Sequence, residues 1–195
     1  IVTCADDVLL NETKDLLKSK FKMKDLGVIS DFLGISFELG EGVIKMNQRK
    51  YVVKVLDKFG MTNCKPKSTP SEQKLVFPDE AKPFDSNLYR QAIGSLIYLM
   101  VCTRPDISYI VSKLSQYCEN PTDDHWIAVK HVFRYLKGTM DYSLCFYKCT
   151  DSLKLTGYSD ADWAGASDRK STSGYCFKLN EDSSVISWKS RKQPT

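Results

Sequence analysis

The sequence predicts an α+β fold in which a helical middle lies between two strand-rich ends. Three observations support this prediction. Apolar residues recur at helical spacing across much of residues 48–137, short runs of strand-forming residues precede and follow that region, and four prolines fall within residues 61–85. The 195 residues are enough for one or two compact units.

The first twenty residues place two adjacent acids between apolar runs. Residues 1–2 and 8–10 are apolar and flank Asp6 and Asp7. This pattern predicts two short strands joined by a tight turn that exposes both carboxylates. A helix over residues 12–21 should follow, because its apolar side chains share one side.

A hairpin and a helix are expected next. Residues 29–39 are rich in strand formers, residues 40–42 contain two glycines, and residues 43–46 return as a second strand. Residues 48–59 then have helical spacing, and Gly60 is placed to end that helix.

Three further helices are expected after the proline-rich connector, over residues 86–103, 105–118 and 122–137. Pro105 is placed to begin the second helix, and Pro121 separates the last two.

Strand-like segments return after Gly138, separated by polar turns. They cover residues 144–147, 153–158, 174–179 and 185–188.

Composition and cysteine spacing exclude several classes of protein. The net charge of +4 is compatible with a polyanionic partner but does not identify one. Apolar runs fall short of the roughly 20 residues of a membrane span, and no secretion signal is recognisable, so we expect neither. The seven cysteines form no Cys-x-x-Cys pair, which suggests a reducing compartment. His125 and His131 are six residues apart, a spacing that disfavours zinc.

A series of short motifs then runs through the chain in order. They are FKMKDLG (21–27), FLGI (32–35), YRQAIGSLIYL (89–99), TRPDI (103–107), RYLKGT (134–139), GYSDADWAG (157–165), RKSTSG (169–174) and SWKSRKQ (187–193). This series resembles copia-type retrotransposon Pol polyproteins over essentially the whole chain.

The resemblance implies a division into three regions. Residues 1–47 would be a C-terminal palm and primer-grip remnant of a reverse transcriptase, with palm-like strands. Residues 48–138 would form its helical thumb and connection. Residues 139–195 would supply the N-terminal strands of a ribonuclease H-like sheet.

The resemblance also implies catalytic and metal-binding roles for Asp6, Asp7 and Asp160. Both reactions use clustered carboxylates to hold two divalent cations, Mg²⁺ or Mn²⁺. The family's Tyr-x-Asp-Asp is here Cys-Ala-Asp-Asp. The remaining acids of both sites would lie beyond the two ends of this chain, so we expect little metal binding and no activity from it alone. Without the motifs, these acids would be interpreted as solvated surface groups.

The expected partner is an RNA/DNA hybrid or a primer–template, whose phosphates attract basic side chains. The candidate contacts are Lys50, Lys54, Arg134, Lys137, Arg169 and Lys170. Basic side chains also often extend into solvent without a ligand. The loop of residues 165–174 is equally compatible with a phosphate-binding turn or a plain hairpin loop.

Two functions remain open. In the first, the chain is a segment of a reverse transcriptase/ribonuclease H. In the second, it is a degenerate or domesticated module that binds nucleic acid, or a protein partner through exposed strand edges, without catalysis. The resemblance suggests a cytoplasmic location in a virus-like particle, or a nuclear one.

Overall fold

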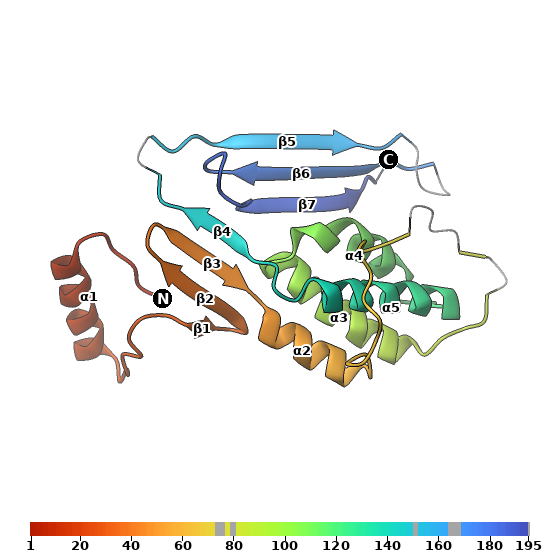
Figure 1. Ribbon diagram of the computed structural model, residues 1–195, viewed down its shortest axis with the longest axis horizontal. Coiled ribbons are helices and arrows are strands. Elements are labelled where there is room, and N and C mark those ends of the chain that lie inside the picture. The colour runs from red at the N-terminus through yellow and green to blue at the C-terminus, as the bar shows by residue number, and fades with distance from the viewer. Residues whose placement is uncertain (73–76, 79–80, 150–151, 164–168, 195) are drawn as a thin grey trace.

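The protein folds into a group of helices and two antiparallel sheets, as predicted for an α+β chain. The computed structural model describes residues 1–72, 77–78, 81–149, 152–163 and 169–194. One sheet has the strand order β1-β2-β3-β4 and the other has the order β5-β6-β7. Figure 1 shows the second sheet above the helices, the first sheet beside them, and helix α1 at one end of the molecule.

Helix α1 (Asp7–Lys20) begins five residues before the predicted helix and replaces the predicted hairpin. The Asp6 side chain causes this difference, because it accepts hydrogen bonds from the backbone N–H groups of Val8 and Leu9. An aspartate at this position satisfies two of the four free N–H groups of a helix start. The predicted strand at residues 8–10 is therefore wrong.

The first sheet consists of β1 (Asp31–Phe32), β2 (Ile35–Gly40), β3 (Val43–Asn47) and β4 (Leu144–Tyr147). The β2–β3 hairpin is confirmed, and a two-residue turn closes it. The predicted strand over residues 29–39 is divided, because Leu33 and Gly34 both have positive φ and form a turn of their own.

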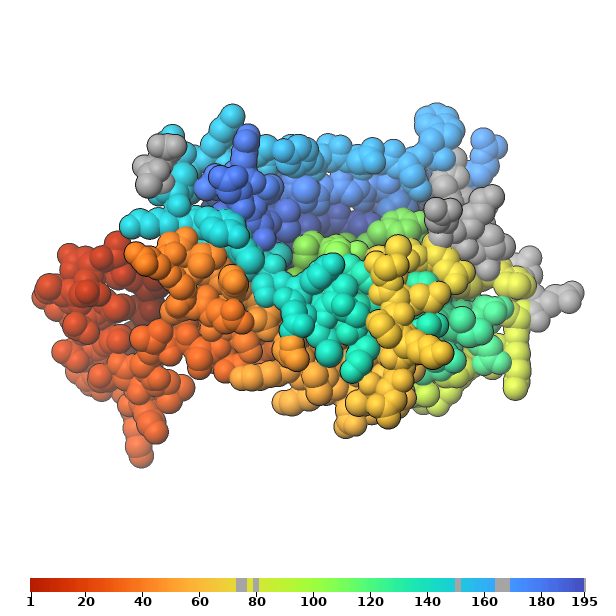
Figure 2. Space-filling view, in the orientation of Figure 1, coloured from red at the N-terminus to blue at the C-terminus, as the bar shows by residue number. Residues whose placement is uncertain are grey.

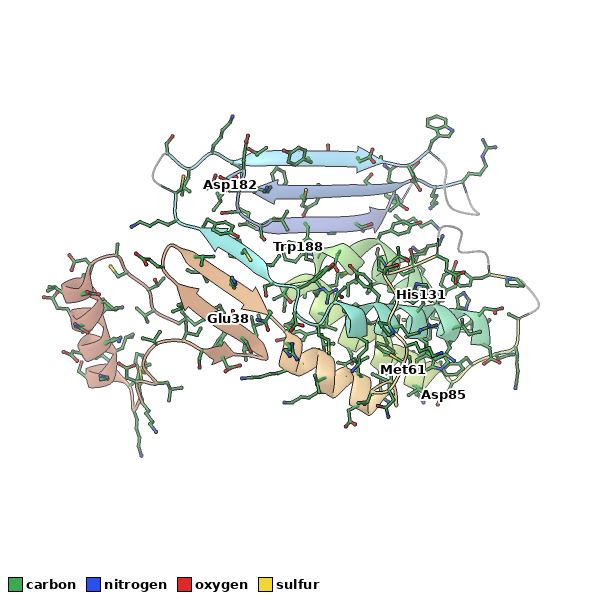
Figure 3. The ribbon with its side chains drawn as sticks, in the orientation of Figure 1. Glu38, Met61, Asp85, His131, Asp182 and Trp188 are labelled. Atoms are coloured by element: carbon green, nitrogen blue, oxygen red, sulfur yellow. The ribbon has the colours of Figure 1, made fainter. Side chains whose placement is uncertain are left out.

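One face of this sheet is apolar. Cross-strand partners share a face, and the register places Leu39 beside Ile44 and Ile44 beside Phe146. The opposite face is polar: Asn47 donates a hydrogen bond to Glu38, which Figure 3 labels on this sheet. Strand β4 pairs with β3, so a strand from residues 139–195 completes the sheet that residues 31–47 begin.

The helices form the hydrophobic core of the molecule. They are α2 (Arg49–Lys58), α3 (Ser86–Cys102), α4 (Ser108–Leu114) and α5 (Asp123–Gly138), with 3-10 turns η1 (Pro105–Ile107) and η2 (Ser115–Tyr117) around α4. The predicted helix boundaries are confirmed within one or two residues for α2, α3 and α5. Tyr89 and Phe133 are fully buried between them. Gly60, with a φ of 66°, follows the end of α2 as predicted.

The second sheet lies against α4. It consists of β5 (Thr156–Ala161), β6 (Thr172–Lys178) and β7 (Ser187–Lys192). Trp188 on β7 donates a hydrogen bond from its indole nitrogen to the carbonyl of Met100 on α3, at 2.9 Å. Figure 3 shows Trp188 at the junction of sheet and helices.

Candidate functional site

Asp6 and Asp7 lie at the N-terminus of α1 and are exposed to solvent. Asp6 Oδ1 is 2.8 Å from the backbone nitrogen of Val8 and 3.2 Å from that of Leu9. Asp7 is the acidic residue of the first turn, where its negative charge interacts favourably with the helix dipole and stabilises the helix. The two carboxylates are therefore a helix cap and its neighbour, and the predicted hairpin tip is absent from this part of the described chain.

Asp160 lies on β5 opposite Gly174 of β6. Its Oδ1 accepts a hydrogen bond from the backbone nitrogen of Ala161 at 2.8 Å. Asp162 is tied to the neighbouring strand, because its side chain accepts a hydrogen bond from the backbone nitrogen of Thr172. Figure 1 shows that β5 and α1 belong to different parts of the molecule.

These acids do not assemble a metal site within the described residues. No three His, Cys, Asp or Glu side chains in those ranges are close enough together to hold an ion. Asp6, Asp160 and Asp162 each accept backbone hydrogen bonds through one carboxylate oxygen. Residues 164–168, which include the end of the GYSDADWAG motif and the start of the loop after it, lie outside the residues that the structure describes.

The six basic candidates lie in three places. Lys50 and Lys54 are exposed on α2, and the Lys50 ammonium contacts both carboxylate oxygens of Asp31, at 2.8 and 2.9 Å. This ion pair and a hydrogen bond from Ser36 hold the pKa of Asp31 below its usual value.

The remaining four basic candidates lie on α5 and before β6. On α5, Arg134 donates to the carbonyl of Lys65 at 2.7 Å, whereas Lys137 is half-buried. Arg169 is exposed with a φ of 60°, and Lys170 donates to the carbonyl of Pro194. Lys50, Arg134 and Lys170 thus have roles in binding other parts of this chain.

Comparison with known proteins identifies the family. Residues 1–73 match the reverse transcriptase (RNA-dependent DNA polymerase) family. The chain is 43% identical to the retrovirus-related Pol polyprotein from transposon RE2 of Arabidopsis thaliana, over 99% of this chain and 13% of that protein. It is 40% identical to the corresponding polyprotein from transposon TNT 1-94 of Nicotiana tabacum, over 99% of this chain and 15% of that protein.

An uncharacterized mitochondrial protein of Arabidopsis thaliana is 39% identical over the whole chain and 80% of its own length. The chain belongs to the copia-type family of transposon Pol polyproteins. It spans only 13–15% of the length of the two polyproteins. No solved structure matches the chain significantly.

Reverse transcriptases use divalent metal ions in the intact enzyme and generally bind a nucleic-acid template–primer. The described residues do not form a complete two-metal site: Asp6 and Asp7 are a pair at a helix start, Asp160 belongs to the other expected site on a separate sheet, and no cluster of three ligands occurs in the described part of the chain. Among the described helices, none is both long and apolar enough to cross a bilayer.

The structure brings together two family motifs whose contact the sequence did not reveal. Arg104 of TRPDI is 97% buried, and its guanidinium binds Asp106 through two nitrogens and Thr139 of RYLKGT through the carbonyl and the hydroxyl. Tyr135 donates to Asp106 at 2.8 Å and its ring faces the guanidinium. Burial and the bond to Asp106 raise the pKa of Tyr135 to about 12.

Both histidines also have structural partners. His125 completes a capping box at the start of α5, because its Nδ1 accepts a hydrogen bond from the backbone nitrogen of Thr122 at 3.0 Å. His131 Nε2 is 3.0 Å from the carbonyl of Thr69 and thereby attaches the connector to α5. Figure 3 labels His131 on that helix.

Proposed function

We propose that this chain is the segment of a copia-type Pol polyprotein that runs from the end of the reverse transcriptase into a ribonuclease H-like domain. Residues 1–47 would be the palm and primer-grip part, residues 48–138 the thumb and connection, and residues 139–195 the start of the ribonuclease H-like part. The observation that carries this proposal is the alignment with two transposon polyproteins along 99% of the chain.

Within that polyprotein, the segment's role is to bind the primer–template or RNA/DNA hybrid rather than to catalyse by itself. Asp6 and Asp7 at one expected site, and Asp160 at the other, each lack the further acids that two-metal chemistry needs, and no cluster of three such ligands occurs among the described residues. Basic side chains on α2 and α5 supply charge for phosphate contacts. The intact polyprotein would complete both metal sites with residues from elsewhere in its sequence.

Two assays on the full 195-residue chain test this proposal. Fluorescence anisotropy with a labelled RNA/DNA hybrid should show binding that weakens steeply as salt is raised. Primer extension on an RNA template, and hydrolysis of the hybrid's RNA strand, should both be undetectable with Mg²⁺ or Mn²⁺. Extension or hydrolysis would overturn the binding-only role, and absence of any binding would overturn the nucleic-acid role.

A second candidate function is a free-standing binding module without catalysis. The observation that favours it is the mitochondrial relative, of which this chain covers 80%. Strand β5 pairs only with β6 among the described strands, so its other edge is available to a protein partner. Sedimentation of the purified chain with host-cell extract would show whether it binds a protein partner. Loss of that binding when β5 is mutated would distinguish this function from hybrid binding.

A further inference from the structure

Residues 20–25 form an exposed segment that we call the lysine arm. It contains Lys20, Lys22 and Lys24, all exposed, alternating with Phe21 and Met23, which are 62% and 52% exposed. Within the described residues, none of the three lysines forms an ion pair. Figures 1 and 2 show the chain after α1 projecting away from the rest of the molecule.

Contacts at the end of the arm hold it against α1. Asp25 lies 3.3 Å from the ammonium of Lys14 and 3.8 Å from that of Lys18, and it accepts a hydrogen bond from the backbone nitrogen of Gly27 at 2.9 Å. The Gly27 bond and then Lys14 lower the pKa of Asp25. The single acid of the arm, Asp25, is therefore engaged by two lysines of α1, which leaves the three lysines of the arm without an acidic partner among the described residues.

We propose that the lysine arm binds single-stranded nucleic acid, with its lysines on successive phosphates and Phe21 stacked on a base. From Lys20 to Lys24 the chain can span at most about 14 Å. Within that length the three lysines, each two residues from the next, can reach neighbouring phosphates of one strand. An exposed aromatic ring between cations is the combination that single-strand binding surfaces use.

An anionic lipid surface is the competing partner for a basic segment with exposed apolar side chains. Lipid-binding clusters commonly contain about four to eight basic residues, and the arm has three. The lysine-arm proposal rests on the proposed function, in which the chain binds nucleic acid. It adds that the arm is one of the contacts and that it binds a single strand.

The test compares two triple variants that remove the same charge. Lys20→Gln/Lys22→Gln/Lys24→Gln removes the arm's charge, and Lys82→Gln/Lys148→Gln/Lys154→Gln removes three exposed lysines elsewhere. Anisotropy with a labelled 20-nucleotide single-stranded DNA is measured over a range of salt concentrations. Loss of three phosphate contacts should reduce the slope of log K against log salt by about 2. The control should keep the slope of the unmodified chain.

The Phe21→Ala variant tests stacking separately. Affinity should fall roughly 5- to 150-fold while the salt slope stays the same, because no charge is lost. All of the substituted side chains are exposed, so none of these changes touches the core, and circular dichroism should show that the core remains folded.

Any one of the following results would overturn the proposal. Equal salt slopes for the arm variant and the control would leave only a general charge effect. Loss of binding to phosphatidylserine vesicles by the arm variant, with DNA binding kept, would assign the arm to lipid. If the unmodified chain bound neither DNA nor hybrid, the proposed function would fail with it; hybrid binding with an unaffected arm variant would overturn the arm alone.

Discussion

Arg104 is a positive charge in a site that water hardly reaches. Its side chain is 3% exposed, and all of its polar contacts are supplied by Asp106 and Thr139. Tyr142 and Tyr135 place their rings beside the guanidinium. The Arg104 guanidinium thereby holds η1 against the end of α5. If it were removed, the Asp106 carboxylate and the Thr139 carbonyl and hydroxyl would lose their hydrogen-bond donor.

Replacing Arg104 with Met should therefore destabilise the protein substantially. We expect the free energy of unfolding to fall by about 2–3 kcal/mol, since Asp106 and Thr139 would keep partly buried polar groups without a partner. Urea denaturation measures this loss. Arg90→Met on α3 is the matched control: Arg90 is exposed with one bond to the carbonyl of Cys118, and its loss should cost less than about 1 kcal/mol. Equal losses would contradict the role of Arg104.

His125 should make stability depend on pH. Burial is the main cause that lowers its pKa below 6.5, whereas Asp124 opposes the shift. The unfolded chain therefore binds the proton more readily than the folded one. Stability is fully present above the unfolded pKa near 6.5 and falls as the pH drops through it towards the lower folded value.

The His125→Gln variant isolates this effect. Glutamine at the same position can retain the capping box but carries no titratable group. Urea denaturation between pH 7.5 and 5.5 should show a smaller loss of stability for the variant than for the unmodified protein. Identical pH profiles would mean that protonation of His125 does not contribute.

At the scale of elements, α1 differs from the other helices because none of its residues is buried. Its stability must come from the Asp6 cap, the first-turn Asp7 and the basic last turn rather than from packing. Asp6→Ala should cost the helix about 1 kcal/mol, which speeds hydrogen exchange of its amides roughly 5-fold.

The same change should leave the urea midpoint of the core unchanged, because α1 lies outside the buried cluster. Asp6→Asn is the matched control, since asparagine caps a helix about as well as aspartate. Faster exchange in both variants would argue that charge near the helix dipole, rather than the cap bond, holds α1.

Sequence periodicity predicted the elements that bury an apolar face. The spacing of Val52, Val55 and Leu56 placed α2 within one residue, because those side chains enter the core. The start of α1 was mispredicted, since a capping bond rather than periodicity decides it. Strands β5 and β7 begin three and two residues later than predicted, and β6 begins two residues earlier, because none of their residues is fully buried and an apolar face does not fix their ends.

The candidate site was less predictable than the fold. Motif order identified Asp6, Asp7 and Asp160, but spacing in the sequence carries no information on which other acids lie close to them, and their metal-binding role remains a prediction. The Arg104–Thr139 contact joins residues 35 positions apart, and each lay within a motif that the sequence had already singled out. The polar residues Arg104 and Thr139, which had no assigned role in their motifs, were the only indication of this contact in the sequence.

At the scale of the whole molecule, the second sheet is attached to the helices mainly where β7 packs on α4 and where Trp188 bonds to α3. A groove of about 430 Å³ lies between β7 and helices α3 and α4, lined in part by Ile97, Met100 and Trp188. Ser183 and Ser184 add hydrogen bonds to the backbone of β4. Trp188 lines this groove and donates to the Met100 carbonyl, so it should supply much of the stability of the contact.

Trp188→Ala should release the second sheet while the helical core remains folded. We expect docking to weaken by about 2 kcal/mol, which corresponds to roughly 30-fold faster tryptic cleavage at lysines of β6 and β7. Trp188→Phe should cost about 1 kcal/mol, because the Met100 carbonyl loses its donor while most of the ring packing remains. Trp163→Ala is the matched control, since Trp163 is 93% exposed and should leave the cleavage rate unchanged. Equal cleavage rates for all three variants would show that the sheet is held by the β4 connection instead.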